Sequence, residues 1–376
     1  MSDKIDQFLE KTELEVPCLV VDLDRVEDRY NQIAQGMAGV DIYYAVKANP
    51  ALQVLRRLVK LGAKFDAASL QEIRMCLDAG TRPRDISFGN TLKKPRAIAE
   101  AHALGIDLFV FDSEGELDKI ATHASGAKVY CRILTENGNA EWPLSRKFGC
   151  EIDMAVDLLA SASDKGLIPY GLSFHVGSQQ PDPHQWDWAI GHAHEAFEKL
   201  AARGIKLEML NMGGGFPAQY RGIIDPFEHF AETIRQSLDK HFGADQPALM
   251  IEPGRAVVAE AGVLISEVIL VSKKRADATR RWVYLDVGLF GGLAETMGEA
   301  IKYPITTPHD GGPSGPVAIA GPTCDGADIL YEHTIYELPL ALRAGDRVRI
   351  EAAGAYTTTY ASVGFNGFAP LQEHYI

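Results

Sequence analysis

The sequence predicts an α/β protein, made of a parallel (β/α)₈ barrel followed by a smaller all-β domain. From about residue 40 to residue 260, eight short apolar runs alternate with helix-like segments, as in a barrel. A doubly wound open sheet would also alternate in this way. However, no GxGxxG follows the first run, and polar residues recur at the C-terminal ends of many runs, where barrels carry their chemistry.

The predicted barrel strands are short apolar runs, and helical patterns connect them. In chain order the strands are Ile42–Val46, Lys64–Ala68, Ile86–Gly89, Leu108–Phe111, Val129–Leu134, Tyr170–Val176, Met209–Met212 and Leu249–Glu252. The helices include Leu52–Leu61, Leu70–Ala79, Lys94–Leu104, Ser113–Thr122, Asp153–Lys165, His184–Ala202 and Phe227–His241. This order places all the strand ends on one face of a barrel.

The alternation of apolar runs and helix-like segments stops after Ala261. Gly- and Pro-rich stretches then separate strand-like runs with little helix between them. These runs are Val263–Ser272, Trp282–Asp286, Pro316–Ala320, Arg347–Ala352 and Thr357–Ser362, and the N-terminal run Pro17–Val21 could join them. We therefore expect a barrel domain over residues 23–262 and a β domain over residues 263–376 together with residues 1–22.

The composition is that of an ordinary soluble globular chain, with 46% hydrophobic residues. The formal net charge of -14 argues against a nucleic-acid partner, and no apolar run reaches the length of a membrane span. The polar start shows no signal-peptide pattern. The five cysteines are odd in number and form no CxxC pair, so neither a metal site nor a disulfide framework is predicted, and a reducing cytoplasm fits best.

Lys47 follows the first apolar run and precedes the turn-forming residues Ala48, Asn49 and Pro50. A lysine at the mouth of a buried strand is expected to shed water, which makes its amine a nucleophile toward carbonyls. The alternative is a lysine that extends from the strand end into solvent, and for this residue alone that is the simpler explanation. The rest of the chain favours the first interpretation.

Charged residues also lie at the second and fifth runs. Asp66 and Ser69 stand at the mouth of the second run, where a carboxylate is most often a helix cap. Arg132 lies inside the fifth run and needs an anionic partner. A structural salt bridge, for instance to Asp66, and contact with an anion or cofactor explain this arginine equally well.

Small residues follow the sixth and seventh runs. His175 is followed by Gly177 and Ser178. A lone histidine at such a place is usually a satisfied core residue, but beside small polar residues in a barrel its flat ring can stack on an aromatic cofactor. The glycines from Gly213 to Gly215 suit backbone N–H groups that close on an anion, and the alternative is a flexible loop.

The eighth run ends in Glu252, and Arg255 follows after a Pro–Gly turn. Each residue alone has a salt-bridge explanation. Together with Lys47 they combine an amine, an anion site and a carboxylate on one barrel face. Pyridoxal phosphate (PLP) needs these three features, which are a Schiff-base lysine, a phosphate pocket and a partner for its pyridine nitrogen.

Eight separate stretches of the chain resemble the ornithine decarboxylase family, the barrel-type PLP-dependent decarboxylases of basic amino acids. The stretches are YYAVKANP, FDAAS, FHVGSQ, NMGGGFP, EPGR, GPTCDGAD, GAYT and FNGF. They occur in order from Tyr43 to Phe368, so the resemblance covers almost the whole chain. It implies a PLP-binding TIM-type barrel, a homodimer with shared active sites and a role in polyamine synthesis.

The resemblance implies roles for the residues around the cofactor. Lys47 would bind PLP as a Schiff base and help to release product, Glu252 would keep the pyridine nitrogen protonated, and His175 would stack on the ring. The implied phosphate ligands are Ser178, Gly214, Gly215, Arg255 and Tyr356, and the implied supporting residues are Asp66 and Arg132.

The resemblance also implies that two subunits share each active site. Cys324 and Asp325 would come from the partner subunit, where Cys324 protonates the carbon that loses CO₂ and Asp325 pairs with the distal ammonium of the substrate. Phe365 would wall the pocket. Lys147 and Asp328 would form ion pairs between the subunits, which makes the homodimer obligatory.

One motif departs from the family pattern. Many members carry a substrate-binding aspartate directly before the glycine equivalent to Gly288, whereas this chain has Val287 there and Asp286 one position earlier. On a strand, a shift by one residue turns the side chain to the other face. Asp286 is therefore the candidate substrate-binding acid, and the preference between ornithine and lysine stays open.

The predicted reaction is decarboxylation of L-ornithine to putrescine, with L-lysine to cadaverine as a second reaction. Diaminopimelate decarboxylase is an alternative, but its substrate would favour an arginine-rich distal pocket over Asp325. A barrel-type racemase would favour an arginine at the pyridine nitrogen, against Glu252. An inactive homologue that binds a regulator of polyamine enzymes would lack Lys47 or Cys324, and both are present.

Overall fold

The structure is a computed structural model of the chain, and it describes residues 3–135, 140–141 and 147–376. Its contacts divide the chain into two compact units. The barrel unit contains Glu27–Pro217 and Ile224–Gly254, and the β unit contains Met1–Val26, Ala218–Ile223 and Arg255–Ile376. The domain boundaries expected from the sequence stay a prediction. No pattern in the sequence indicated that residues 218–223 belong with the β unit.

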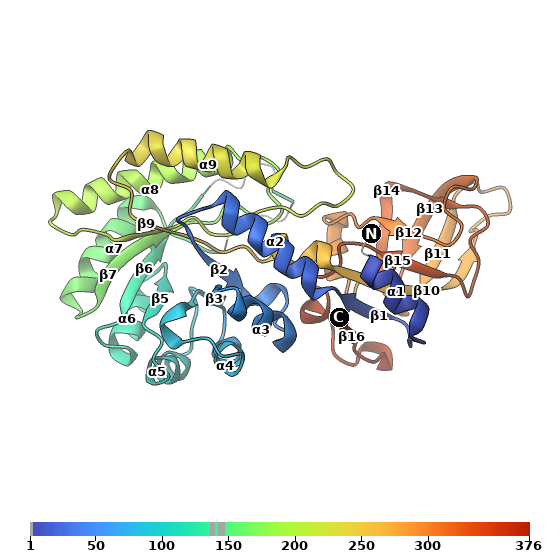
Figure 1. The fold of residues 1–376 in the computed structure, drawn as a ribbon, viewed down its shortest axis with the longest axis horizontal. Helices are drawn as coiled ribbons and strands as arrows, with labels where there is room; N and C mark the ends of the chain where they lie inside the picture. Colours follow the sequence, from blue (N-terminus) through green and yellow to red (C-terminus); the bar gives the residue numbers. More distant parts are fainter. Residues whose placement is uncertain (1–2, 136–139, 142–146) are drawn as a thin grey trace. The chain divides into compact units, whose positions relative to one another are not determined.

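The barrel unit confirms the predicted (β/α)₈ fold. Its eight strands close into a barrel in sequence order, with every neighbouring pair parallel, including the first strand and the last (Figure 1). The strands are β2 Asp41–Ala45, β3 Lys64–Ala67, β4 Ile86–Phe88, β5 Leu108–Phe111, β6 Lys128–Arg132, β7 Ile168–Ser173, β8 Met209–Asn211 and β9 Ala248–Ile251.

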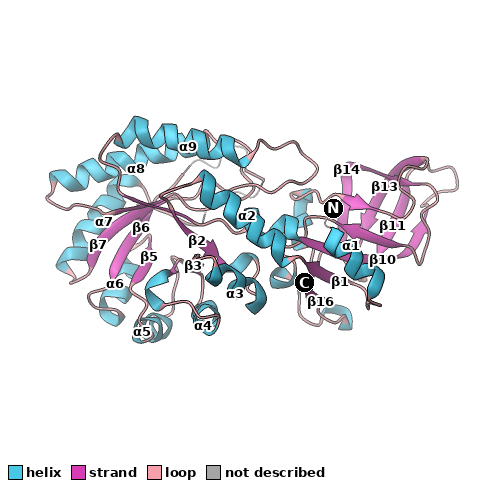
Figure 2. Ribbon diagram, viewed as in Figure 1, coloured by secondary structure: helices cyan, strands magenta, loops and turns pink. Residues whose placement is uncertain are grey.

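A helix follows each of the first seven barrel strands and covers the outside of the barrel (Figure 2). These helices are α3 Leu52–Lys60, α4 Leu70–Asp78, α5 Pro95–Ala103, α6 Glu114–His123, α7 Ile152–Asp164, α8 Gln185–Ala202 and α9 Phe227–Phe242. The short α10 Arg255–Val258, which follows β9, belongs to the β unit. The strands are apolar because parallel strands are buried on both faces, which is why the sequence located them to within a few residues. Two further helices, α1 Asp3–Lys11 and α2 Leu23–Gly36, precede the barrel strands.

Large side chains fill the barrel interior. Tyr43, Val110, Tyr130, Met209 and Met250 form one buried cluster. The hydroxyl of Tyr130 lies 2.8 Å from the Ser87 hydroxyl, so the polar end of this ring is satisfied inside the core. Because the interior is packed, reactive groups have room only in the loops at the strand ends.

The β unit is built around long antiparallel strands. Its strands are β1 Cys18–Val21, β10 Gly262–Ser272, β11 Arg281–Leu285, β12 Ile305–Thr306, β13 Ser314–Ala320, β14 Ile329–Pro339, β15 Arg347–Ile350 and β16 Gln372–Tyr375. β1 pairs with β10, with Cys18 opposite Ile265, which confirms that the N-terminal run joins this sheet. Among the described residues, no helix is both long and apolar enough to cross a membrane.

Two predictions about the β unit were wrong. Residues 357–362 are not a strand, because the chain forms a short 3₁₀ turn over Thr358–Tyr360. The hydroxyl of Thr357 donates to the backbone carbonyl of Ala353, and such local bonds compete with sheet formation. The strand Ile329–Pro339 was missed, although it pairs along most of β13.

Candidate active site

The loop after β2 carries Lys47. The strand ends at Ala45, one residue earlier than predicted, and Val46–Ala48 forms a 3₁₀ turn that presents the lysine. The Tyr44 hydroxyl donates to the Asn49 carbonyl at 2.9 Å and fixes this turn. Lys47 is exposed while the residues on both sides are buried. The expectation that the lysine is shielded from water is therefore wrong, because it sits on the turn and not within the strand.

Asp66 lies at the end of β3, directly beside Ala45 in the register of the barrel. Its side chain is buried, and its Oδ1 atom accepts no hydrogen bond from the residues that the structure describes. Burial raises the pKa of Asp66 well above its ordinary value and the Glu252 carboxylate raises it further, while Lys47 opposes the rise. Ser69, and not Asp66, caps the next helix, by accepting the Glu72 N–H at 3.2 Å.

Arg132 is the last residue of β6 and is half-buried. Its guanidinium lies 5.1 Å from the centre of the Phe148 ring. Burial lowers the pKa of Arg132, while the carboxylates of Glu252 and Asp112 oppose this effect. Within the described parts of the chain no ion pair joins Arg132 to Asp66, so this explanation of the arginine loses support.

His175 stands two residues beyond the end of β7. Its Nδ1 accepts the Gly177 N–H at 3.0 Å, and its carbonyl accepts the Thr135 hydroxyl at 2.7 Å. Burial lowers the pKa of His175 well below its ordinary value, and the cations Arg132 and Lys47 lower it further. The imidazole is therefore neutral near pH 7, which suits a flat stacking surface.

The glycine loop after β8 packs tightly against its neighbours. A Cβ on Gly213, Gly214 or Gly215 would lie 2.1, 2.6 or 2.5 Å from a backbone carbonyl oxygen. Gly213 and Gly215 also have positive φ values, of 66° and 104°, which other residues rarely adopt. The Gln180 N–H donates to the Gly215 carbonyl at 2.9 Å and ties this loop to the one that contains Ser178.

Glu252 follows the end of β9 and is held by Asn211, a residue that the sequence analysis missed. The Asn211 amide donates to Glu252 Oε1 at 2.5 Å, and its Oδ1 accepts the Gly213 N–H at 2.9 Å. Burial raises the pKa of Glu252, while Asn211, Lys47 and Arg132 oppose the rise. A polar residue that ends a buried strand was the available signal for Asn211, as it was for Asp66.

The β unit holds the other predicted phosphate ligands, Arg255 and Tyr356. Arg255 is buried and donates to both carboxylate oxygens of Glu295, at 2.6 and 2.5 Å, and to the Tyr220 hydroxyl at 2.8 Å. Its guanidinium also lies 5.0 Å from the Tyr356 ring centre. Tyr356 has a φ of 56°, a strained backbone conformation that is often found at functional sites.

Cys324 and Asp325 are exposed on the loop between β13 and β14. The Cys324 N–H donates to the Asn366 side-chain oxygen at 3.0 Å, which ties this loop to the turn that contains Phe365. Asp328 is buried, and its oxygens accept N–H groups of Leu289 and Thr323 at 2.8 and 3.0 Å.

The partner proposed for Asp328, Lys147, is exposed, and its amine lies 5.0 Å from the Phe148 ring centre. An ion pair between these two residues across a dimer stays a prediction. It would have to use a carboxylate whose oxygens already accept hydrogen bonds within the chain.

A cavity of about 280 Å³ lies within the β unit. Asp286, Val287, Gly288 and Phe365 are among its lining residues. Asp286 accepts the Ser266 hydroxyl at 2.5 Å and the Glu267 N–H at 3.0 Å, so its own sheet already engages this carboxylate. The cavity lining includes carboxylates but neither arginine nor lysine among the described residues.

Comparison with known protein families gives one match, over residues 23–259. The family is described as pyridoxal-dependent decarboxylase, pyridoxal binding domain. Among curated proteins, the lysine/ornithine decarboxylase of Selenomonas ruminantium is 33% identical to this chain over 369 residues. The match covers 98% of this chain and 91% of that protein.

Two solved structures share both the barrel and the β unit. The structure of SrLDC in complex with PLP and cadaverine has a TM-score of 0.88 and 32% identity, and the match covers 99% of this chain and 93% of that one. The arginine decarboxylase of Paramecium bursaria Chlorella virus has a TM-score of 0.90 and 29% identity, with 100% of both chains covered. By their names, these similar proteins act on different basic amino acids.

Proposed function

Because the chain belongs to the pyridoxal-dependent decarboxylases, we propose that it converts L-ornithine to putrescine and CO₂, with L-lysine as a second substrate. The cofactor is PLP, and the class of reaction is decarboxylation of a basic amino acid. The observation that carries the proposal is the meeting of Lys47, Asp66 and Glu252 at the strand ends. Each of these groups affects the ionisation of another, so the three charges lie together.

The described residues fit PLP. Asp66 has a buried oxygen with no hydrogen-bond donor among the described residues, as expected for a group that faces a bound partner. The glycine loop leaves no space for a side chain, so only its backbone can line that part of the site. Lys47 is exposed on the adjacent turn.

When bound, PLP supplies an electron sink for the electrons that remain after CO₂ leaves. Lys47 would hold the cofactor through its amine, with Asp66 beside it to stabilise the positive charge. Glu252, oriented by Asn211, would hold a proton on the pyridine nitrogen. The neutral ring of His175 would stack on the cofactor.

The proposed phosphate ligands are those that the resemblance to the family implies. In the barrel unit they are Ser178, Gly214 and Gly215, on loops that a backbone hydrogen bond joins. In the β unit they are Arg255 and Tyr356. Arg132 would support the ring side of the site, since its guanidinium lies near Glu252 and lowers the pKa of that carboxyl.

The charge of the distal pocket supports a substrate with a second ammonium group. We assign this role to Asp325, and to Asp286 in the β-unit cavity, with Phe365 as the apolar wall. Diaminopimelate carries a carboxylate at that end and would need a cation in the pocket. The absence of arginine and lysine from the described lining of the cavity argues against this substrate.

We also propose that the enzyme is a homodimer in which Cys324 and Asp325 complete the site of the partner subunit. Both residues are exposed on one short loop, as this arrangement requires. Mixing Lys47→Ala protein with Cys324→Ala protein tests the idea, because hybrid dimers would contain one intact site. Recovery of part of the activity is expected, and no recovery would contradict a shared site.

The substrate is tested by CO₂ release from ornithine, lysine, arginine and diaminopimelate under identical conditions. We expect kcat/KM to be highest for ornithine, lower for lysine and lowest for diaminopimelate. Lys47→Ala protein is the control for uncatalysed release. Fastest turnover of diaminopimelate would refute the assignment of Asp325, and fastest turnover of arginine would refute ornithine as the preferred substrate.

A further inference from the structure

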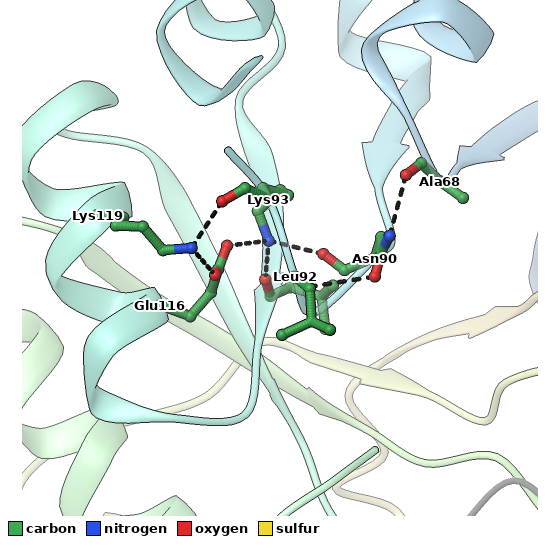
Figure 3. Close-up of polar contacts among 7 residues, drawn as sticks. Ala68, Asn90, Leu92, Lys93, Glu116 and Lys119 are labelled. Atoms are coloured by element: carbon green, nitrogen blue, oxygen red, sulfur yellow. Dashed lines mark hydrogen bonds and ion pairs between the residues drawn. The ribbon is translucent and has the colours of Figure 1, made fainter. Parts of the chain in front are cut away.

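A buried lysine, Lys93, lies in the loop after β4, outside the residues assigned so far (Figure 3). Its amine donates to the backbone carbonyls of Asn90 at 2.7 Å and Val110 at 2.6 Å, and pairs with Glu116 Oε1 at 3.0 Å. The side chain is 0% exposed. Lysine is almost never fully buried without such partners. These contacts must therefore offset the free energy that is lost when the amine is removed from water.

Charged groups from α6 surround the Lys93 amine. Glu116 accepts from Lys119 at 2.5 Å with its second oxygen, and the Lys119 amine also donates to the Lys93 carbonyl at 2.6 Å. Burial lowers the pKa of Lys93 to about 8, while the carboxylates of Glu116 and Asp112 oppose this and Lys119 adds to it. The ring of Phe88 lies 5.5 Å below the amine. The cluster therefore joins the loop after β4 to β5 and to α6.

The loop that Lys93 holds is the wall against which Asp66 packs. The Asn90 amide donates to the Ala68 carbonyl at 3.3 Å, and the Gly89 N–H donates to the Ala67 carbonyl at 2.9 Å. A Cβ on Gly89 would lie 1.6 Å from Asp66 Oδ1. Because that oxygen accepts no hydrogen bond from the described residues, contact with the loop backbone fixes its position.

We propose that Lys93 is a positioning residue of the active site, which holds the Gly89–Asn90 backbone against the Asp66 carboxylate and so keeps this acid beside Lys47. The proposal rests on the proposed function, because it is through Asp66 and Lys47 that the loop would act on PLP. It assigns Lys93 no contact with the cofactor or the substrate.

The proton on Lys93 matters for this role. The ammonium form of Lys93 donates to two carbonyls and forms an ion pair with Glu116, whereas the neutral amine would lose the ion pair. Loss of the proton would release one acceptor and leave Glu116 with Lys119 as its cation. Since the pKa is about 8, the hold on Asp66 should weaken at moderately alkaline pH.

The test measures the affinity of the apoprotein for PLP between pH 7 and pH 9, by titration of the cofactor absorption. In Lys93→Met we expect affinity at pH 7 to fall about tenfold, the order seen when a residue that orients a ligand group is lost. We also expect the wild-type fall in affinity near pH 8 to be absent from this variant. Lys93→Arg keeps the charge and should recover part of the affinity.

The matched control is Lys64→Met, which also breaks a lysine–carboxylate pair, between Lys64 and Asp41 at 2.6 Å. Both residues begin barrel strands, so they lie at the barrel end opposite the site. If Lys93→Met does not fold, Lys93→Met with Glu116→Gln also removes the buried Glu116 charge, which would have lost one of its two cations, and is measured instead.

Wild-type affinity and an unchanged pH profile in the folded Lys93 variant would overturn the proposal, as would an equal loss in Lys64→Met. This measurement uses no amino-acid substrate. Failure of the wild-type enzyme to release CO₂ from ornithine would refute the proposed substrate and leave the result for Lys93 standing.

Discussion

Two buried charged clusters in this chain are built in opposite ways. In the β unit, Arg255 and Glu295 form a two-fold hydrogen-bonded pair, and the Tyr220 hydroxyl accepts a further bond from the arginine. In the barrel unit, Asp66 and Glu252 are both acids in an environment that raises their pKa values, and one oxygen of Asp66 has no donor among the described residues.

The difference indicates which charges serve the fold and which serve a ligand. A buried ion pair whose partners both come from the chain is complete without any ligand. Two neighbouring acids that disfavour each other's ionisation cost free energy in the folded state, and such groups cluster at functional sites. The barrel cluster therefore has the character of a binding site, whereas in the β unit the Glu295 carboxylate supplies the counter-ion that holds the Arg255 guanidinium in position.

The largest expected effect is that of Lys47→Ala on activity. Loss of the amine should lower kcat/KM by at least ~10³-fold, about 4 kcal/mol at 1.36 kcal/mol per tenfold, with the fold unchanged. The measurement is CO₂ release, together with borohydride reduction of the wild-type holoenzyme and peptide mapping, which should place the pyridoxyl group on Lys47. Lys60→Ala, at the end of α3, is the control. A label on any other lysine would contradict the assignment.

The second effect concerns stability and the paired cluster. Glu295→Gln leaves Arg255 charged in a buried site without its counter-ion, and should lower the free energy of unfolding by about 3 kcal/mol. Urea denaturation of the apoprotein, followed by circular dichroism, measures the change. Asp277→Asn removes a partner from the exposed Arg275–Asp277 pair and should have no measurable effect. Equal effects of the two substitutions would show that the buried pair is not a structural support.

Removing a charge from the barrel cluster should raise the stability of the apoprotein, the opposite of the effect expected for Glu295→Gln. Glu252→Gln keeps an oxygen for the Asn211 amide and removes an acid whose pKa burial raises. The apoprotein should therefore melt about 2 °C higher at pH 7, the shift that roughly 1 kcal/mol produces in a domain of this size. The same variant should lose activity, because the pyridine nitrogen would lose its partner. A lower melting temperature would mean that the Glu252 carboxyl stabilises the folded apoprotein. It would contradict the idea that this buried acid lowers stability and is present for the cofactor.

The sequence predicted the barrel strands and some of the buried charged residues, but not others. The barrel strands were found because buried parallel strands are apolar, and Lys47 and Glu252 were found because each interrupts or ends such a run. The strand predicted to begin at Thr357 does not form. β-Branched residues favour strands, but the hydroxyl of Thr357 bonds to the local backbone. Asn211 and Lys93 were missed because their importance lies in tertiary contacts, with Glu252 and with the carbonyl of Val110. Nothing in the sequence shows which of the adjacent Lys93 and Lys94 turns inward.

The last effect is a pH dependence that separates the two kinds of carboxylate. In the β unit, Glu299 accepts N–H groups of Glu332, His333 and Thr334 at 2.7, 2.7 and 2.6 Å. Although partial burial opposes it, these hydrogen bonds lower the pKa of Glu299 to about 2. A lowered pKa gives stability that is present above the ordinary value of 4.5 and is lost as the pH falls toward 2.

For Glu252, whose pKa is raised, the stability contribution is present below 4.5 and is lost as the pH rises. Melting curves of Glu299→Gln and Glu252→Gln apoproteins from pH 3 to pH 7 should therefore diverge from wild type in opposite directions as the pH rises. Glu299→Gln should melt below wild type at pH 7, by roughly 2–4 °C, the shift that about 1 kcal/mol produces in a domain of 150–250 residues. Both differences should shrink toward pH 3, because Glu252 is then protonated in the folded protein, and Glu299, which stays ionised in the folded protein, is protonated in the unfolded chain. Shifts of the same sign would mean that Glu299 and Glu252 do not differ in how the chain satisfies their charges.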